Sequence, residues 1–345
     1  MDLNEKTILV TGATGSFGTR FIQTVLREHD PHSVRVFSRD ELKQSDMQRH
    51  FGEEPRLRYL LGDVRDLPRL VQATRGVDLI VHAAALKQVP ASEYNPFEAV
   101  KTNVLGAENV VAAAIENAVP LTVALSTDKA VNPVNLYGAT KLCAEKLVTQ
   151  ANAYAADSPS RFANVRYGNV VGSRGSVIPL FKAQAASGTV TITDERMTRF
   201  WITLDQAVTF VLDSLSIVGG GEVFVPKIPS ARIPEIAEAF APDAERRAIG
   251  IRPGEKLHEV LVTEDESRHS YELPDRYVVL PEYASWQLRP VEGGARMPDG
   301  FRYASDTNDR WVTVEDLREM FEFLTPGGGQ EEDPTPAAET APTSS

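Results

Sequence analysis

The feature that most constrains the fold lies near the start of the chain, where an apolar run leads into closely spaced glycines. Residues 6–10 (KTILV) predict a buried strand, TGATGSFG follows, and apolar residues then recur on one helical face over 17–26. A strand, a glycine loop and a helix in this order are typical of the turn that binds a dinucleotide pyrophosphate. Gly12 would permit the tight turn, Gly15 the approach of the pyrophosphate, and Gly18 the packing of helix on strand.

Strands and helices are predicted to alternate along the rest of the first half. Further strands are expected at 34–37, 57–61, 79–82, 121–125 and 162–166, separated by helices at 41–50, 66–74, 97–117 and 136–155. This alternation predicts an α/β fold, a doubly wound parallel sheet of the Rossmann type with helices on both faces. The ligand of such a sheet binds beyond the carboxyl ends of its strands.

The sequence predicts a division into three parts. A dinucleotide-binding domain is expected over 1–170, and a helix and a strand within 203–227 are expected to return to its sheet. Residues 171–202 and 228–325 are expected to form a smaller substrate-binding subdomain. The composition of 326–345 (PGGGQEEDPTPAAETAPTSS) is typical of a disordered tail.

Candidate catalytic residues lie in STDKAVNPVNLYGATK, after the strand predicted at 121–125. Tyr137 and Lys141 are four residues apart and share one face of a helix. An ammonium below the phenol would favour the phenolate, which can accept an alcohol proton during removal of hydride. A Y-x-x-x-K spacing alone is weak, but Thr127, Asp128 and Lys129 precede it by one short loop.

The residues after the second strand bear on the choice of dinucleotide. A guanidinium and an ammonium, from Arg39 and Lys43, suit the 2′-phosphate of NADP. Asp40 argues for the ribose hydroxyls of NAD, and either basic group could be a solvated surface residue. We expect NADP rather than NAD.

Three arginines in loops far apart along the chain are candidates for binding a diphosphate. Arg174, Arg199 and Arg252 could converge on it, although each taken alone is more simply a solvated surface residue. Two other reactive side chains have simpler explanations: we expect His82 to be a core histidine and Cys143 a small buried residue. No metal site is predicted.

Composition limits the partners and the compartment. The formal net charge of −12 argues against nucleic acid or an anionic membrane as the main partner. Residues 1–6 are polar, and no apolar run is long enough to cross a membrane, so neither a signal peptide nor a spanning helix is expected. The single cysteine excludes an internal disulfide and fits a reducing compartment, so we expect a cytoplasmic protein.

Several motifs together identify the chain as similar to a known group of proteins. TGATGSFG, HAAALK, STDKA and YGATK resemble the extended short-chain dehydrogenase/reductase superfamily. SRDELKQ, GDVRDL, RYGNVVGSRGSV, MTRFWITL, GGEVFVPKIPS and IRPGEKLHEVL resemble, more narrowly, its configuration-inverting UDP-N-acetylglucosamine 4,6-dehydratases. The resemblance spans roughly residues 5–325, and these enzymes open pathways to pseudaminic acid and related bacterial sugars.

The resemblance implies a set of binding residues and a homo-oligomer. The implied NADP contacts are Gly12, Thr14, Gly15, Ser16, Phe17, Gly18, Ser38, Arg39, Asp40, Glu41, Leu42, Lys43, Asp63, Val64, Ala83, Tyr137, Lys141 and Val170. The implied contacts with UDP-N-acetylglucosamine are Lys87, Lys141, Asn169, Arg174, Arg199, Arg252 and Glu255.

The resemblance also implies a hydro-lyase mechanism. C4 of the sugar is oxidised, water is lost across C5 and C6, and hydride returns to C6. The product is a UDP-2-acetamido-2,6-dideoxy-4-keto-hexose of the β-L-arabino configuration. Retaining relatives carry Asp-Glu in the loop, whereas here Lys129 replaces the glutamate. Lys129 is therefore expected to be the C5 base, with its pKa lowered by Lys141, the nicotinamide and desolvation. Asp128 is expected to protonate the leaving hydroxyl, and Thr127 to hydrogen-bond the 4-oxygen.

Two other functions stay open from the sequence. A UDP-sugar 4-epimerase would share the glycine loop and the Tyr137–Lys141 pair but would leave Asp128 and Lys129 idle. A catalytically silent NADP-binding scaffold would need none of these side chains. The alternative to catalytic roles for Asp128 and Lys129 is that they form a structural ion pair with their neighbours.

Overall fold

A ten-stranded sheet forms the centre of the computed structural model, which describes residues 1–155, 158–171 and 177–322. Seven neighbouring strands are parallel, in the spatial order β3 (Leu57–Leu61), β2 (Ser33–Ser38), β1 (Thr7–Thr11), β4 (Leu79–His82), β5 (Leu121–Thr127), β6 (Arg161–Tyr167) and β10 (Val223–Pro226). The order reverses between β1 and β4, as in a doubly wound sheet. The predicted fold class is confirmed, and so is the return of 222–225 to the main sheet.

The remaining strands of this sheet are antiparallel and come from the last third of the chain. They are β15 (Arg276–Val279), β14 (Ser270–Glu272) and β16 (Ala295–Arg296). These strands were not predicted from the sequence. Each has two to four residues, too few for the alternation of apolar and polar residues that indicates a strand to be recognised.

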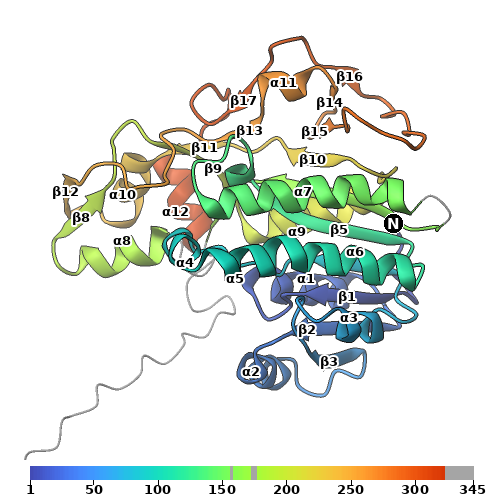
Figure 1. The fold of residues 1–345 in the computed structure, drawn as a ribbon. Coiled ribbons are helices and arrows are strands. Elements are labelled where there is room, and N and C mark those ends of the chain that lie inside the picture. The colour runs from blue at the N-terminus through green and yellow to red at the C-terminus, as the bar shows by residue number, and fades with distance from the viewer. Residues whose placement is uncertain (156–157, 172–176, 323–345) are drawn as a thin grey trace, which may run out of the picture.

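Helices cover both faces of the sheet (Figure 1). On one face α3 (Leu67–Ala73) packs on α6 (Gly106–Glu116), and α6 packs on α7 (Leu136–Tyr154). On the other, α1 (Ser16–Glu28) packs on α9 (Leu204–Leu215), and α2 (Glu41–Phe51) follows β2. Alternate residues of β1 enter different cores, because Ile8 and Val10 face one cluster and Leu9 the other.

The helix predicted over 97–117 has an interruption. It consists of α5 (Pro96–Val100), a π-helical turn (Lys101–Leu105) and α6. Asn103, in the wider turn, holds the backbone of Leu86: its Oδ1 accepts the Leu86 N–H at 2.8 Å, and its Nδ2 donates to the Leu86 oxygen at 2.9 Å. The turn thereby fixes the loop after β4. The loop leads into a short helix, α4 (Val89–Tyr94).

A second group of elements lies beside the sheet, to the left and top of Figure 1. In this group β9 (Thr198–Ile202) lies between β11 (Ser230–Arg232) and β7 (Asn169–Val170) and pairs with both. The other pairs are β12 (Glu245–Ala248) with β8 (Thr189–Ile192), and β13 (Val260–Val262) with β17 (Tyr303–Ala304). Its helices are α8 (Val177–Ala185), α10 (Ile233–Phe240), α11 (Glu264–Ser267) and α12 (Val314–Glu322). Phe181, Trp201 and Ile236 belong to a separate apolar core here. The predicted domain boundaries stay a prediction, and the predicted tail lies outside the described residues.

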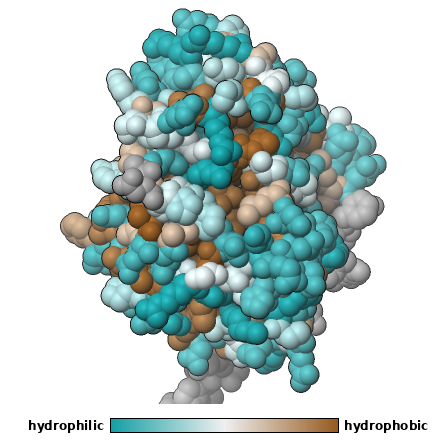
Figure 2. Space-filling model, turned by 90° about the vertical axis from the view of Figure 1, so that its right-hand side faces the viewer, coloured by the Kyte–Doolittle hydropathy of each residue, from teal (hydrophilic) through white to brown (hydrophobic). Residues whose placement is uncertain are grey.

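Apolar side chains are mostly inside. On the face shown in Figure 2, hydrophilic residues predominate, and apolar residues gather in small patches between them. Among the helices that the structure describes, none is both long and apolar enough to cross a membrane. His82 is buried and shares a 2.7 Å hydrogen bond with Thr11, which confirms it as a core histidine. Cys143 is exposed on α7, so the prediction that it is buried was wrong.

Candidate active site

A cavity of about 610 Å³ opens beyond the carboxyl ends of the parallel strands. Residues that end or follow successive strands line it, in the order Gly12, Ser38, Gly62, Ala83, Thr127 and Gly168. Its volume lies within the range of small-molecule and cofactor sites, roughly 300–1,000 Å³. It is therefore the candidate active site.

Most of the predicted dinucleotide contacts lie in the wall of this cavity. They are Gly12, Thr14, Gly15, Ser16, Phe17, Gly18, Ser38, Arg39, Asp40, Lys43, Asp63, Val64, Ala83, Tyr137, Lys141 and Val170. Glu41 and Leu42 do not line it and are exposed on α2. The fold thus brings six separate stretches of the sequence to one site.

The glycine loop has the close contacts that a dinucleotide turn needs. Gly12 has a φ of +65°, and a Cβ there would lie 2.8 Å from the Ala84 backbone, where the loops after β1 and β4 meet. A Cβ on Gly18 would lie 2.5 Å from Ala13, so α1 packs directly on the loop. Gly15 immediately precedes α1, whose free amides favour an anion. These observations fit a bound pyrophosphate.

Acidic groups accompany the basic ones at the end of β2. The Asp40 carboxylate caps α2 by accepting the Lys43 N–H at 3.0 Å, and it lies 3.3 Å from Lys43 Nζ. The bond from the Lys43 backbone holds the pKa of Asp40 below its usual value. Arg39 Nη1 lies 3.8 Å from Asp63 Oδ2 and is half exposed. Asp40 is therefore already engaged by the helix, while Arg39 and Lys43 remain at the cavity wall.

The predicted acid and base are in direct contact at the end of β5. Asp128 begins a 3₁₀ turn (Asp128–Ala130) and is fully buried. Its Oδ1 accepts hydrogen bonds from Lys129 Nζ at 3.0 Å and from Thr127 Oγ1 at 2.9 Å. Its Oδ2 is buried without a hydrogen-bond partner among the described residues. Thr127 and Lys129 line the cavity, whereas Asp128 lies behind them.

Charges around this pair alter the pKa values of both groups. Burial raises the pKa of Asp128 and outweighs the opposing effect of the Lys129 ammonium. Burial would lower the pKa of Lys129, but the charges of Asp128 and Glu259 outweigh burial and raise it. The predicted lowering of the Lys129 pKa is therefore wrong for this arrangement, because the prediction did not include Glu259.

Tyr137 and Lys141 lie in the first turns of α7, and both line the cavity. Burial raises the pKa of Tyr137, although Lys129 and a hydrogen bond with Thr127 lower it. Lys141 Nζ instead donates to the Leu125 oxygen at 2.7 Å, and burial lowers its pKa to about 8. The predicted phenolate beside Lys141 is thus wrong for this arrangement: Tyr137 keeps its proton at neutral pH, and the cation that acts on it is Lys129.

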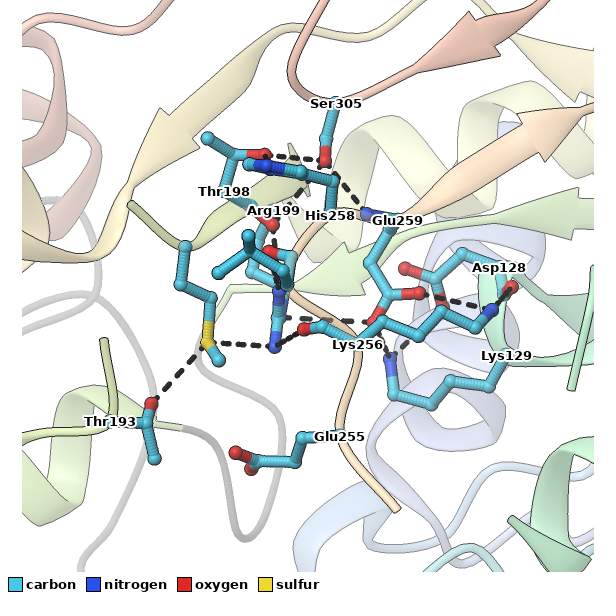
Figure 3. A network of polar contacts seen from close by, with 12 residues as sticks. Asp128, Lys129, Thr193, Thr198, Arg199, Glu255, Lys256, His258, Glu259 and Ser305 are labelled. Atoms are coloured by element: carbon cyan, nitrogen blue, oxygen red, sulfur yellow. Dashed lines mark hydrogen bonds and ion pairs between the residues drawn. The ribbon is translucent and has the colours of Figure 1, made fainter. Parts of the chain in front are cut away.

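A buried carboxylate that the sequence analysis missed lies behind the Asp128–Lys129 pair (Figure 3). Glu259 precedes β13, and its carboxylate lies among the side chains of Lys129, Arg199 and Lys256. Only the i, i+3 spacing of Lys256 and Glu259 in IRPGEKLHEVL hints at an ion pair. Nothing local in the sequence indicates that Glu259 meets Lys129.

The predicted sugar-nucleotide contacts are divided between the cavity and its surroundings. Lys87 and Asn169 line the cavity, and Asn169 Oδ1 is buried without a hydrogen-bond partner among the residues that the structure describes. Arg199 is buried, and its guanidinium donates to the backbone oxygens of Thr198, Leu257 and Lys256.

Two other predicted contacts, Arg252 and Glu255, do not line the cavity, whereas Lys141 does. Arg252 is largely exposed and pairs with Glu255 at 2.6 Å. The Glu255 carboxylate in Figure 3 points away from the Glu259 network. Arg174 lies outside the described residues. The predicted convergence of the three arginines on a diphosphate therefore stays a prediction.

Two aromatic residues of the wall were also missed. Trp201 on β9 and Tyr167 at the end of β6 line the cavity. The Trp201 Nε1–H is buried without a hydrogen-bond partner in the described part of the chain. Burial and the neighbouring Tyr137 raise the pKa of Tyr167. Strand pairing across distant sequence brings both residues here, so no local pattern could place them.

Known proteins resemble this chain over nearly its whole length. A model of the family described as polysaccharide biosynthesis protein matches residues 8–281. An inverting UDP-N-acetylglucosamine 4,6-dehydratase of Campylobacter jejuni is 48% identical over 326 residues, which are 92% of this chain and 97% of the relative. A UDP-glucose 4-epimerase of Rickettsia conorii is 40% identical over 329 residues, 92% of this chain and 95% of the relative. The X-ray structure of Pen from Bacillus thuringiensis is 39% identical, with a TM-score of 0.86 over 94% of this chain and 99% of that one.

Proposed function

Because the chain belongs to the family of polysaccharide biosynthesis proteins, we propose that it is an inverting UDP-N-acetylglucosamine 4,6-dehydratase. This hydro-lyase would oxidise C4, remove water across C5 and C6, and yield a 4-keto-6-deoxy sugar inverted at C5. The observation that carries the proposal is the 3.0 Å contact of Lys129 with Asp128 beside Tyr137, at the wall of the dinucleotide cavity.

We propose NADP as the dinucleotide, on the basis of two basic side chains in the cavity wall. Arg39 and Lys43 line it at the end of β2, where they could meet a 2′-phosphate, while the Asp40 carboxylate is engaged as the cap of α2. The amides at the start of α1 would hold the pyrophosphate. When bound, NADP⁺ would accept hydride from C4 and later return it to C6.

Tyr137 would take the proton of the sugar 4-hydroxyl as the phenolate, after its own proton has been lost to solvent. The nearby Lys129 charge and the Thr127 hydrogen bond both lower its pKa, so they favour the transfer although burial opposes it. Thr127, at the cavity wall, would also hydrogen-bond the 4-oxygen. Lys141 would fix the start of α7 against Leu125 at the end of β5.

Lys129 and Asp128 would perform the elimination as a pair. Moving one proton along their hydrogen bond, from Lys129 Nζ to Asp128 Oδ1, makes an amine base and a carboxylic acid in one step. The raised pKa of Asp128 supports this. The amine then removes the C5 hydrogen, made acidic by the 4-ketone, and the acid protonates the 6-hydroxyl, which leaves as water. A proton delivered to the opposite face of C5 inverts it.

The product decides between this function and its rivals. Incubation with UDP-N-acetylglucosamine and NADP⁺ is expected to give a C6 methyl doublet by NMR. A 4-epimer without the methyl signal would instead support the 4-epimerase that the Rickettsia relatives suggest. No turnover of any UDP-hexosamine would support the silent scaffold.

The proposal also covers the compartment, the assembly and the pathway of the enzyme. The resemblance supports a cytoplasmic homo-oligomer acting in a pathway of the pseudaminic acid type. Large exposed apolar side chains, Tyr94 on α4 and Phe97 on α5, support contact with a second copy. Residues 171–202 and 228–325 would supply the sugar-nucleotide contacts, including Arg199, Arg252 and Glu255. Light scattering of the purified chain would test the oligomer.

A further inference from the structure

Glu259 is a buried charge without a role in the proposed reaction. It is 2% exposed, and burial of a carboxylate is costly unless cations surround it. Its Oε1 lies 3.7 Å from Lys129 Nζ and 3.8 Å from Arg199 Nε, and its Oε2 lies 3.5 Å from Lys256 Nζ. Burial would raise its pKa, but these three cations together lower it, so it is ionised at neutral pH.

The three cations depend on Glu259 to different degrees. Arg199 donates to three backbone oxygens, and Lys256 Nζ donates to the backbone oxygens of Asp128 and Val131 at 3.2 and 2.5 Å. Lys129 has a single hydrogen bond from its ammonium among the described residues, the one to Asp128. Loss of the Glu259 charge would therefore affect the place and the charge of Lys129 most.

The backbone that carries this carboxylate is held on both sides by Ser305. The Glu259 backbone N–H donates to Ser305 Oγ at 2.9 Å, and the Ser305 N–H donates to the Glu259 oxygen at 2.8 Å. These bonds fix the segment before β13 against the chain next to β17. Glu259 can thus act as an anchor for a lysine that lies on a different element.

We propose that Glu259 is a positioning residue, whose fixed carboxylate holds the Lys129 ammonium beside Asp128 and sets the pH range in which the pair can act. This inference rests on the proposed dehydratase function. The charged groups facing Lys129 and Glu259 are Asp128 from the 3₁₀ turn, Arg199 from β9 and Lys256 from the loop before β13, with the Tyr137 phenol nearby. His258, the neighbour of Glu259, shares its Nδ1 hydrogen bond with Thr198 instead.

The direction of the effect follows from charge. A negative charge 3.7 Å from an ammonium favours its protonated form, so Lys129 without Glu259 would lose its proton more easily. The Lys129–Asp128 pair acts with one proton between its two groups, so the rate rises with pH until the pair has lost its second proton, and the charge of Glu259 raises the pKa of both groups. Removing the charge of Glu259 is therefore expected to move the acidic limb of the pH–rate profile to lower pH.

The test is the pH dependence of kcat and of C5 hydrogen exchange in heavy water. Glu259→Gln keeps the shape and removes the charge, and we expect its acidic limb about one to three pH units lower, the shift typical of a charge at this distance. Glu259→Asp keeps the charge but withdraws it by one methylene. We expect its limb to stay near the wild-type position while kcat falls about tenfold at a similar KM, because the ammonium is misplaced.

Glu266→Gln is the matched control, because Glu266 is another carboxylate bound to a buried arginine, Arg166, but not to Lys129. The acidic limb of the pH–rate profile of this control should stay at the wild-type pH. A slower Glu259→Gln enzyme with an unmoved limb would overturn the proposal, and so would a Glu259→Asp enzyme with wild-type kcat. Absence of a 4-keto-6-deoxy product from the wild type would instead overturn the proposed function.

Discussion

Lys129 and Tyr137 share the proton chemistry, and the charge of one controls the acidity of the other. The Lys129 ammonium lowers the pKa of Tyr137, and its own pKa is raised by Asp128 and Glu259. An amine base at this position must therefore give up a proton to a neighbour first. Asp128, buried and with a raised pKa, is the acceptor in contact with it.

Tyr137→Phe tests the first proton transfer. The variant loses the phenol but keeps the ring, so binding of the dinucleotide should change little. C4 oxidation should fall by about two to four orders of magnitude, the usual contribution of a positioned base. Stopped-flow absorbance of the reduced dinucleotide measures this step. Reduction within a few-fold of the wild-type rate would exclude Tyr137 as the acceptor.

The site residues differ in how well the sequence reveals them. The glycine loop and the Tyr137–Lys141 spacing are local patterns, and the fold brings both to the cavity. Glu259 and Trp201 come from strands or loops whose partners are distant, and only the tertiary structure shows that they lie beside Lys129 or the cavity. The direction of the Lys129 pKa was therefore wrong although its position was identified.

At the scale of elements, one buried arginine joins the helix that carries Tyr137 to two other segments. Arg166 on β6 is 1% exposed, and its Nη2 lies 2.5 Å from Glu145 on α7 and 2.8 Å from Glu266 on α11. Its Nη1 also donates to the Leu261 oxygen of β13 at 2.7 Å. Removing one partner of such a group leaves an uncompensated buried charge.

The Glu266 carboxylate predicts acid sensitivity. Burial would raise its pKa, but Arg166 and its other hydrogen bonds lower it to about 2 from the ordinary 4.5. Because the folded pKa is lower, the stabilisation is present above about pH 4.5 and is lost as the pH falls toward 2. The shift corresponds to a loss on the order of 3 kcal/mol in the free energy of unfolding.

Urea unfolding of the wild type and of Glu266→Gln, measured between pH 7 and the acid limit of folding, checks this. At pH 7 the free energy of unfolding of Glu266→Gln should be lower than that of the wild type. On acidification it should fall by less than that of the wild type. Parallel curves for the two proteins would show that the Arg166–Glu266 pair does not couple folding to pH.

The elements that the sequence predicted are those with long, locally periodic patterns. The parallel strands and their helices were identified because each is a continuous apolar or amphipathic run. The π-helical turn around Asn103 was not, since it leaves the apolar pattern of the helix nearly unchanged. Short strands such as β12 and β13 were not predicted, because they acquire their identity from pairing with distant partners, β12 with β8 and β13 with β17.

At the scale of the whole molecule, the cavity joins the large sheet to the second group of elements. Its wall includes the loops after β1 to β6 and also Trp201 of β9 and Leu204 of α9. A dinucleotide bound there would contact both the large sheet and the second group of elements. Binding should consequently stabilise the folded molecule.

NADP at about one hundred times its Kd should add about 2.7 kcal/mol to the free energy of unfolding, by mass action. NAD at the same concentration should add less, because it lacks the phosphate that Arg39 and Lys43 would bind. Gly15→Val, with a side chain directed at the loop, should abolish both effects. Thermal unfolding with each dinucleotide measures them, and a larger shift with NAD would contradict the preference for NADP.

The central claim is that an amine removes the C5 hydrogen of the 4-keto sugar, and exchange at C5 in heavy water measures that step directly. With Lys129→Ala and UDP-N-acetylglucosamine, transient reduction of NADP⁺ should still occur because Tyr137 is present, but more slowly because the charge that lowers its pKa is gone. Deuterium incorporation at C5 should fall by at least about a hundredfold. Incorporation at the wild-type rate would contradict the account and remove Lys129 from the role of base.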